Sequence, residues 1–225
     1  MLLDLVRVTG PANQPVSLDQ AKRQVKLEPD ETENDEELGD ILAQATEAMD
    51  GYAGWLGRAL ITQQWKLCLP GFWAQSHPDV RPDYFPPGLL TIWPHRHQPR
   101  IRLPLPPLQS VQSVAYVDTT GTAQTLSSSL YTVIDGPRGE LAAAPGQTWP
   151  DTQDDNPRAV TITFTCGYGD TADDVPSQIK RAILLIVGHW YEHKEAVVGV
   201  ENRDSSTELP LGARAMIDLI RRQRA

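Results

Sequence analysis

Residues 160–166 read VTITFTC, and this heptapeptide decides the fold class. Val160, Ile162, Phe164 and Cys166 alternate with threonines, which is the two-residue period of a β-strand with one buried face. A strand with one polar face is typical of an antiparallel sheet, whose other face packs on a core. The sequence therefore predicts an antiparallel sheet in the central part of the chain.

A β-rich zone extends from this strand back toward residue 59. Further strand patterns lie at residues 59–69, 100–103, 111–117 and 123–133. The sequence DTTG at 118–121 separates the last two and predicts a hairpin, and DGPRG at 135–139 predicts another turn. Residues 73–99 contain six prolines, too many for a helix or a central strand. We expect them to form a long loop that is either functional or mobile.

Helical patterns lie on both sides of the β-rich zone. Ser17 and Gln20 fit a capping box, and we expect Pro29 to end the helix that follows. A second helix begins near Asn34 or Asp35. Its apolar residues keep the 3.6-residue period until glycines end it: Leu38, Ile41, Leu42, Ala45, Met49, Tyr52, Ala53, then Gly54 and Gly57. Pro176 opens a third helix, and residues 213–220 suggest a short fourth one.

These patterns together predict an α+β fold. It is a small helical bundle of about four helices, with an antiparallel β-sheet region inserted between the second and third helices. Residues 1–58 and 170–225 would form the helical core, and residues 59–169 the β-rich insertion with the long Pro-rich loop 73–99. The 225 residues suffice for one large domain or two small ones.

Composition excludes several classes of protein. No apolar run reaches the roughly 18 residues of a membrane span, and the first 15 residues lack the pattern of a signal peptide. Cys68 and Cys166 lie in strand patterns without a C-x-x-C pair, which favours two small core residues over a disulfide or a structural metal site. We expect no cofactor.

The net charge of −9 is unevenly distributed. Residues 28–50 hold ten acidic side chains and no basic one. This run is either a solvated helix start or a surface that faces a polyanion without adhering to it, and both readings disfavour a grip on phosphates. The end of the chain is basic instead, with four arginines in residues 214–224.

One motif suggests catalysis. Residues 189–193, HWYEH, match the H-x-x-E-H signature of inverted zinc peptidases, with His189 and His193 on one helix face and Glu192 as a base. Only about 32 residues follow to supply a third ligand. Imidazoles also suit the negative end of a helix dipole. We therefore prefer a structural helix end, and we keep a zinc-dependent hydrolase as the alternative.

Several blocks together resemble the tailed-phage head–tail connector (adaptor) proteins. The first block, residues 15–65, is PVSLDQAKRQVKLEPDETENDEELGDILAQATEAMDGYAGWLGRALITQQW. Later blocks resemble the family's β region, last strand, third helix and terminal segment: LPLPPLQSVQSVAYVDTTGTAQTL, YTVIDGPRGELAAAPGQTWP, VTITFTCGYGD, VPSQIKRAILLIVGHWYEHKEAV and LPLGARAMIDLIRRQR. The blocks cover nearly the whole chain in order, although loop 73–99 looks longer than is usual in the family.

The resemblance implies a structural virion protein without enzymatic activity. Such proteins form a homo-oligomeric ring, typically of about twelve copies, below the portal protein of the capsid. The ring extends the channel for double-stranded DNA, without sequence-specific binding, and docks the tail or a stopper (head-completion) protein. Its place would be the head–tail interface of the virion, and the host cytoplasm during assembly. No membrane is involved.

Within that hypothesis, two groups of residues are candidates for function. The candidate channel or ring-face residues are acidic: Glu33, Asp35, Glu36, Glu37 and Asp40. The candidate portal-docking residues lie in the terminal segment: Arg214, Leu219, Ile220, Arg221 and Arg222. The competing class, besides a zinc hydrolase, is a monomeric β-rich binding module that ignores the portal.

Overall fold

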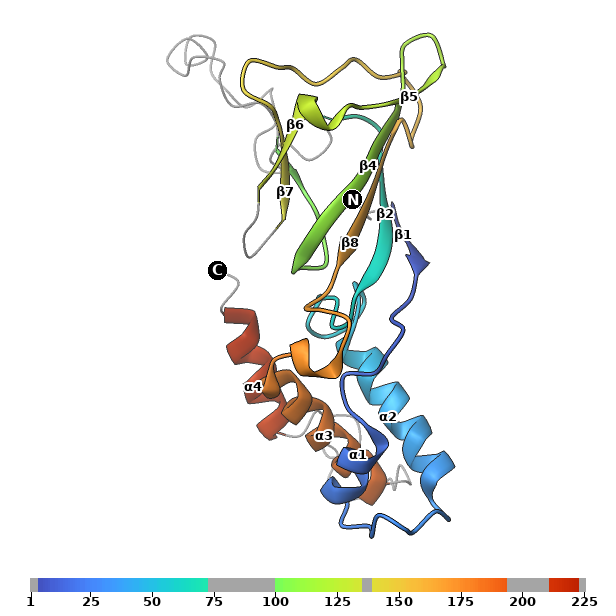
Figure 1. Cartoon of the computed structure of the whole chain (residues 1–225), viewed down its shortest axis with the longest axis vertical. Helices are drawn as coiled ribbons and strands as arrows, with labels where there is room; N and C mark the ends of the chain where they lie inside the picture. The colour runs from blue at the N-terminus through green and yellow to red at the C-terminus, as the bar shows by residue number, and fades with distance from the viewer. Residues whose placement is uncertain (1–3, 73–99, 135–138, 194–210, 223–225) are drawn as a thin grey trace, which may run out of the picture. The chain divides into compact units, whose positions relative to one another are not determined.

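The computed structural model describes residues 4–72, 100–134, 139–193 and 211–222, the side chains of residues 211, 221 and 222 excepted. The elements run in this order: β1 (Asp4–Thr9), α1 (Leu18–Gln24), α2 (Asp35–Met49), β2 (Gln63–Leu69), β3 (Ile101–Arg102), β4 (Leu108–Val117), β5 (Ala123–Thr125), η3 (Ser128–Leu130), β6 (Tyr131–Ile134), β7 (Glu140–Ala143), β8 (Val160–Cys166), η4 (Ala172–Asp174), α3 (Ser177–Glu192) and α4 (Leu211–Arg222) (Figure 1). None of the helices described is long and apolar enough to cross a membrane.

The predicted α+β fold class is confirmed. Four α-helices lie in the described part of the chain, and an antiparallel sheet region is inserted between α2 and α3. The chain divides into two compact units, one of residues 1–10 and 63–166 and the other of residues 11–62 and 167–225. The assignment of residues 1–58 to the helical part was wrong at its start, because residues 4–9 form β1 and pair with β2. The predicted loop 73–99 lies outside the described residues.

The β unit contains a five-stranded sheet of order β1-β2-β8-β4-β5 with antiparallel neighbours. The strand predicted at 160–166 is confirmed as β8, and it lies in the middle of the sheet. Its buried residues pair with buried residues of β2, as in Phe164 opposite Trp65 and Ile162 opposite Leu67. The threonines of β8 lie on the other, polar face, so the period read from the sequence is the period of burial.

A second, three-stranded sheet of order β3-β7-β6 completes this unit. The single strand predicted at 123–133 was wrong, since β5, η3 and β6 divide this stretch. The two strands then pair in different sheets, β5 with β4 and β6 with β7. Residues 135–138 of the predicted turn lie outside the described residues. The side chains of residues 123–133 follow the period of a strand, but this local pattern does not specify which strand each half of the stretch pairs with.

The hairpin predicted around DTTG is present, with a turn that Asp118 organises. Its carboxylate accepts hydrogen bonds from the backbone N–H of Thr120 (2.9 Å) and Thr122 (3.0 Å). It also accepts from the Thr120 hydroxyl (2.6 Å) and the Gln124 amide (3.0 Å). These hydrogen bonds lower the pKa of Asp118 from 3.8 to about 2, and the bond from the Thr120 side chain has the largest effect.

The Asp118 turn is expected to remain formed in acid until the pH falls to about 2. A lowered pKa means that the carboxylate's contribution to stability is complete above the ordinary value of 3.8 and is lost as the pH falls through the folded value. An NMR titration of the Asp118 carboxyl carbon measures that midpoint. Thr120→Val should return it toward the ordinary value, and a midpoint already ordinary in the native chain would contradict the geometry.

The helical unit packs α1, α2, α3 and α4 around one apolar core. Its largest buried residues include Leu38, Met49, Leu56, Leu60 and Ile61. The capping box is confirmed, because Ser17 accepts from the Gln20 N–H and Gln20 accepts from the Ser17 N–H. The second helix begins at Asp35 as predicted, the third follows Pro176, and the fourth is present.

Two predicted helix ends were wrong. The first helix ends at Gln24, before Pro29, and Lys26 adopts a positive φ of 62°. The second ends at Met49, so Tyr52 lies beyond it and is exposed. There the Asp50 carboxylate accepts a hydrogen bond from the Leu60 N–H (2.8 Å), which holds the returning chain. Apolar residues continued the period beyond both ends. The first helix nevertheless closes with a local hydrogen bond from the Leu27 N–H to the Lys22 carbonyl (3.0 Å), and the second closes at the Asp50–Leu60 contact.

Candidate functional surfaces

The acidic residues singled out by sequence lie at the start of α2. Glu33 precedes the helix, Asp35, Glu36 and Glu37 form its first turn, and Asp40 follows one turn later. Negative charge is favourable at this end because of the helix dipole. Glu33, Glu36, Glu37 and Asp40 are exposed, and we call these four the acidic face.

The fifth acidic residue has an internal role instead. The Asp35 carboxylate forms an ion pair at 2.6 Å with the ammonium of Lys22, a residue of α1 that is buried. The Lys22 ammonium also donates to the carbonyl oxygens of Glu31 (2.7 Å) and Pro29 (3.3 Å). A buried lysine needs such partners, because an unpaired charge is costly away from water. Lys22 therefore secures the α1–α2 connection, and the sequence analysis missed it.

The predicted docking residues also divide between surface and core. Arg214 and Leu219 are exposed on α4, with Leu219 48% accessible. Ile220 is buried with Ala213 and Ile217 in the core of the helical unit, so it cannot serve as an exposed anchor. Arg221 lies in α4 with Arg222, but their side chains are outside the described part of the structure. Deleting α4 would consequently damage the core as well as any docking surface.

The two histidines of HWYEH lie at the end of α3. Their rings are 4.5 Å apart between centroids, and the Nδ1 atom of His193 is 2.9 Å from the carbonyl oxygen of His189. His193 is the C-cap residue of the helix. Within residues 4–72, 100–134, 139–193 and 211–222, no three His, Cys, Asp or Glu side chains come together as a metal site. This geometry favours a helix end.

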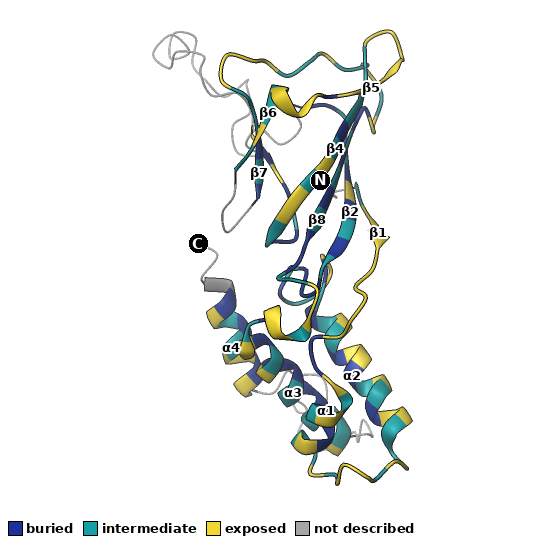
Figure 2. Cartoon of the chain, in the orientation of Figure 1, coloured by how far each residue is buried: buried dark blue, intermediate teal, exposed yellow. Residues whose placement is uncertain are grey.

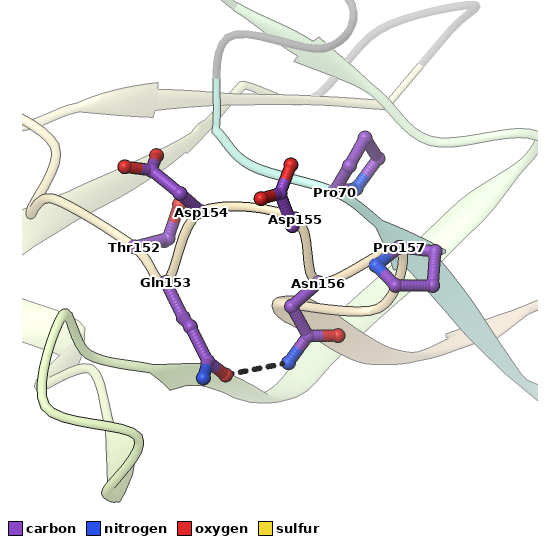
Figure 3. A pocket seen from close by; sticks show the side chains of 7 residues that line it. All are labelled: Pro70, Thr152, Gln153, Asp154, Asp155, Asn156 and Pro157. Atoms are coloured by element: carbon purple, nitrogen blue, oxygen red, sulfur yellow. Dashed lines mark hydrogen bonds between the residues drawn. The ribbon is translucent and has the colours of Figure 1, made fainter.

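A depression of about 310 Å³ lies beside the loop that precedes β8 (Figure 3). Its lining residues are Pro70, Thr152, Gln153, Asp154, Asp155, Asn156 and Pro157. The Asn156 amide donates to the Gln153 side chain at 3.1 Å, and this bond closes the loop on itself. The lining residues include the carboxyl groups of Asp154 and Asp155 and no His, Lys or Arg side chain.

The strand β1 is a surface feature that the sequence analysis missed. It is an edge strand of the five-stranded sheet, and its residues 6–9 are exposed (Figure 2). Val6 and Val8 are 45% and 46% accessible. The available signal was the run DLVRVT before Gly10-Pro11, since β-branched residues bounded by turn residues indicate a strand.

The fold therefore defines a class of protein: an α+β chain in which a four-helix unit is joined to an antiparallel β unit through chain crossings at residues 10–11, 62–63 and 166–167. The features of its described residues that bear on function are surfaces: the acidic face, the exposed side of α4 and the edge strand β1.

Three solved structures share this fold along nearly its whole length. A chain of the virion of a native gene transfer agent (GTA) particle is 21% identical, covers 97% of this chain and 95% of its own, and has a TM-score of 0.68. A chain in the neck of an empty GTA particle computed with C6 symmetry is 20% identical, covers 98% of this chain and 95% of its own, and has a TM-score of 0.67. A chain in the neck of a native GTA particle computed with C12 symmetry is 21% identical, with the same coverages and a TM-score of 0.59. No protein-family model and no curated protein sequence matches the chain.

At this level of identity the likeness establishes a shared fold. Its extent matters, because both units are matched together and neither chain leaves a large part unmatched. The fold is thus shared with chains of gene transfer agent particles.

Proposed function

We propose that this chain is a structural protein of a phage-like virion, a head–tail connector that forms a ring in the particle neck. The observation that carries the proposal is the chain-long likeness to neck chains of particles computed with C6 and C12 symmetry. Repetition about an axis in those necks supports a ring of about twelve copies, in which two different patches of each copy meet. The chain would act in the virion, after assembly in the host cytoplasm.

In this proposal the acidic face lines the channel or one face of the ring. Its residues Glu33, Glu36, Glu37 and Asp40 are exposed at one helix end, and the same run of sequence holds no basic residue. A ring repeats these charges at every copy. Such a lining repels the phosphates of passing double-stranded DNA, which favours sliding over binding.

The exposed part of α4 is the proposed contact with the portal protein. Leu219 offers an apolar anchor and Arg214 a charge, and an anchor with polar surroundings is the usual pattern of an energetically important contact. Arg221 and Arg222 remain candidates for charge-assisted bonds. A tail or stopper protein would then meet another face of the ring.

Electron microscopy of the purified chain, alone and mixed with the portal protein of the same particle, tests the proposal. We expect rings or portal-capping density. Leu219→Asp should weaken portal capture by at least tenfold, because a charge replaces the anchor. Arg23→Ser, an exposed change on α1, is the matched control. Equal capture by both variants would remove α4 from the contact, whereas a native chain that ignores the portal would contradict the connector role.

Two other classes predict different results in the same preparation. A zinc hydrolase would carry about one zinc ion per chain and lose it in His193→Ala, which elemental analysis measures. A monomeric β-rich binding module would stay a single chain with or without the portal. The capping position of His193, described above, is the observation against the first class.

A further inference from the structure

Among the described residues, the edge of β1 that faces away from β2 is the surface that most clearly calls for a binding partner. Edge strands expose backbone N–H and C=O groups that can pair with another strand, and soluble proteins usually protect them with charged side chains. Only two residues of β1 are charged, Asp4 and Arg7. Between them and beyond them stand the exposed valines Val6 and Val8.

Both charges of β1 are engaged inside the β unit. The Asp4 carboxylate forms an ion pair with the Arg158 guanidinium, including a contact of 3.2 Å. The Arg7 guanidinium lies over the Trp65 ring, 4.9 Å from its centroid, as a cation–π contact. Because these contacts hold both charged side chains against their own sheet, the two charges do not prevent another strand from pairing with the edge of β1. An exposed edge with apolar side chains is expected to be covered in an assembly.

A complementary edge exists on the same sheet. β5 pairs with β4 only over residues 115–117, and the Val114 carbonyl accepts from the Leu126 N–H. Residues 110–113 of β4 therefore border β8 on one side and no described strand on the other. Two register shifts in β4, between 108 and 110 and between 111 and 113, keep the regular stretch short. Any pairing there involves few residues and gains strength by repetition around a ring.

The register of the sheet places residues 110–113 of β4 in the same cross-strand rows as residues of β1. Val6 lies opposite Lys66, Lys66 opposite Thr163, and Thr163 opposite Ser113. Each of these pairings is antiparallel, so β1 and β4 run in opposite directions. A β1 strand of another copy, set against β4 in the same row, would again be antiparallel and would continue the sheet.

We infer that β1 of each copy pairs with the open edge of β4, residues 110–113, in the adjacent copy, so that the five-stranded sheet continues from copy to copy. The inference rests on the proposed ring and names the contact between its subunits. The occupant is a second copy because a ring requires two different patches to meet, and the two edges match in row, direction and lack of free charge. Each copy would both give and receive one strand.

Cysteine cross-linking tests this register. Val6→Cys combined with Ser113→Cys, in a Cys68→Ser background, puts both thiols in one row. Within one copy they are three strands apart, about 14 Å at the usual strand spacing, too far for a disulfide. Mild oxidation of native rings should therefore convert single chains into a ladder of covalent multimers on a denaturing gel. Each single-cysteine variant should remain a single chain.

Three further variants make the outcome decisive. Val6→Cys with Gln124→Cys places the second thiol on β5, the other exposed strand of that edge. A ladder from this pair instead, or dimers from Val6→Cys alone, would overturn the β1–β4 contact. Val6→Glu, which would face Lys66 within its own sheet, should abolish rings without lowering the thermal unfolding temperature. Val6→Thr, which keeps the shape and β-branching, should retain the rings.

These gels, together with electron microscopy of the same chains, separate this inference from the connector proposal. Native chains that form no ring, alone or with the portal protein, would contradict the ring and the inference with it. If the native chain forms rings, the β1 contact alone would be contradicted by two results together: no ladder from the Val6→Cys, Ser113→Cys pair, and rings that persist in Val6→Glu.

Discussion

Gly167→Ala is expected to lower the free energy of unfolding of the helical unit by about 3 kcal/mol or more. Gly167 has a φ of +130°, which side-chain-bearing residues rarely adopt. A β-carbon there would lie 2.6 Å from the carbonyl carbon and oxygen of Ile61 and 2.7 Å from the nitrogen of Thr62. These are backbone atoms, so no side chain can rotate away to relieve the overlap.

The position matters because the chain passes between the two units beside it. The Tyr168 N–H donates to the Leu60 carbonyl at 3.1 Å, and the Thr62 N–H donates to the Gly169 carbonyl at 2.9 Å. Any displacement of Gly167 from Ile61 would strain both hydrogen bonds. The change should therefore disturb the part of the chain that leads into β2 as well as the part that follows β8.

Chemical denaturation, followed by far-ultraviolet circular dichroism at wavelengths that report the helices and the sheets, measures the unfolding of both units. Gly146→Ala is the matched control, because Gly146 also has a positive φ (+79°) but open space around it. It should cost only about 1 kcal/mol, the strain of the backbone conformation alone. Equal losses in the two variants would show that the overlap at Gly167 is relieved.

Lys22→Met is expected to destabilise the helical unit by about 3 kcal/mol, although methionine has a similar length and is apolar. The substitution removes the partner of the Asp35 carboxylate and the donor to the Glu31 and Pro29 carbonyls. The Asp35 side chain is 30% accessible, but the carboxylate oxygen that faces Lys22 is buried, and this oxygen and the two carbonyls would lose their donor. The loss should appear first in the α1–α2 connection.

Hydrogen exchange of residues 25–34 and chemical denaturation together measure this loss. Arg23→Met is the matched control on the same helix, because Arg23 is exposed and its replacement should change stability by less than about 0.5 kcal/mol. Combining Lys22→Met with Asp35→Asn should recover part of the loss, since the unpaired charge is then gone. A Lys22→Met chain as stable as the Arg23→Met chain would mean that water replaces the lysine.

The sequence also suggested a function. The blocks that resemble head–tail connectors led to a virion protein, and the chain-long likeness to chains of gene transfer agent particles is consistent with it. The roles of individual residues were less accessible. Asp35 and Ile220 carry the residue types expected of a surface charge and a docking anchor, yet one is paired with Lys22 and the other lies in the core.

The sequence by itself determined what depends on neighbouring residues. The alternation in 160–166 identified β8, the pair Ser17 and Gln20 identified the start of α1, and the acidic turn at Asp35 identified the start of α2. In each case the signal and the structure involve the same few residues, because side-chain period and capping are local properties.

Only the tertiary structure decided which distant segments meet. It paired residues 4–9 with residues 63–69, sent β5 and β6 to different sheets, and turned Lys22 toward Asp35. Local patterns cannot encode these choices, since a strand presents the same two edges to any partner and an acidic residue looks alike whether paired or free. The partner is selected by the energy of the whole packed arrangement, in which register and burial must agree at once.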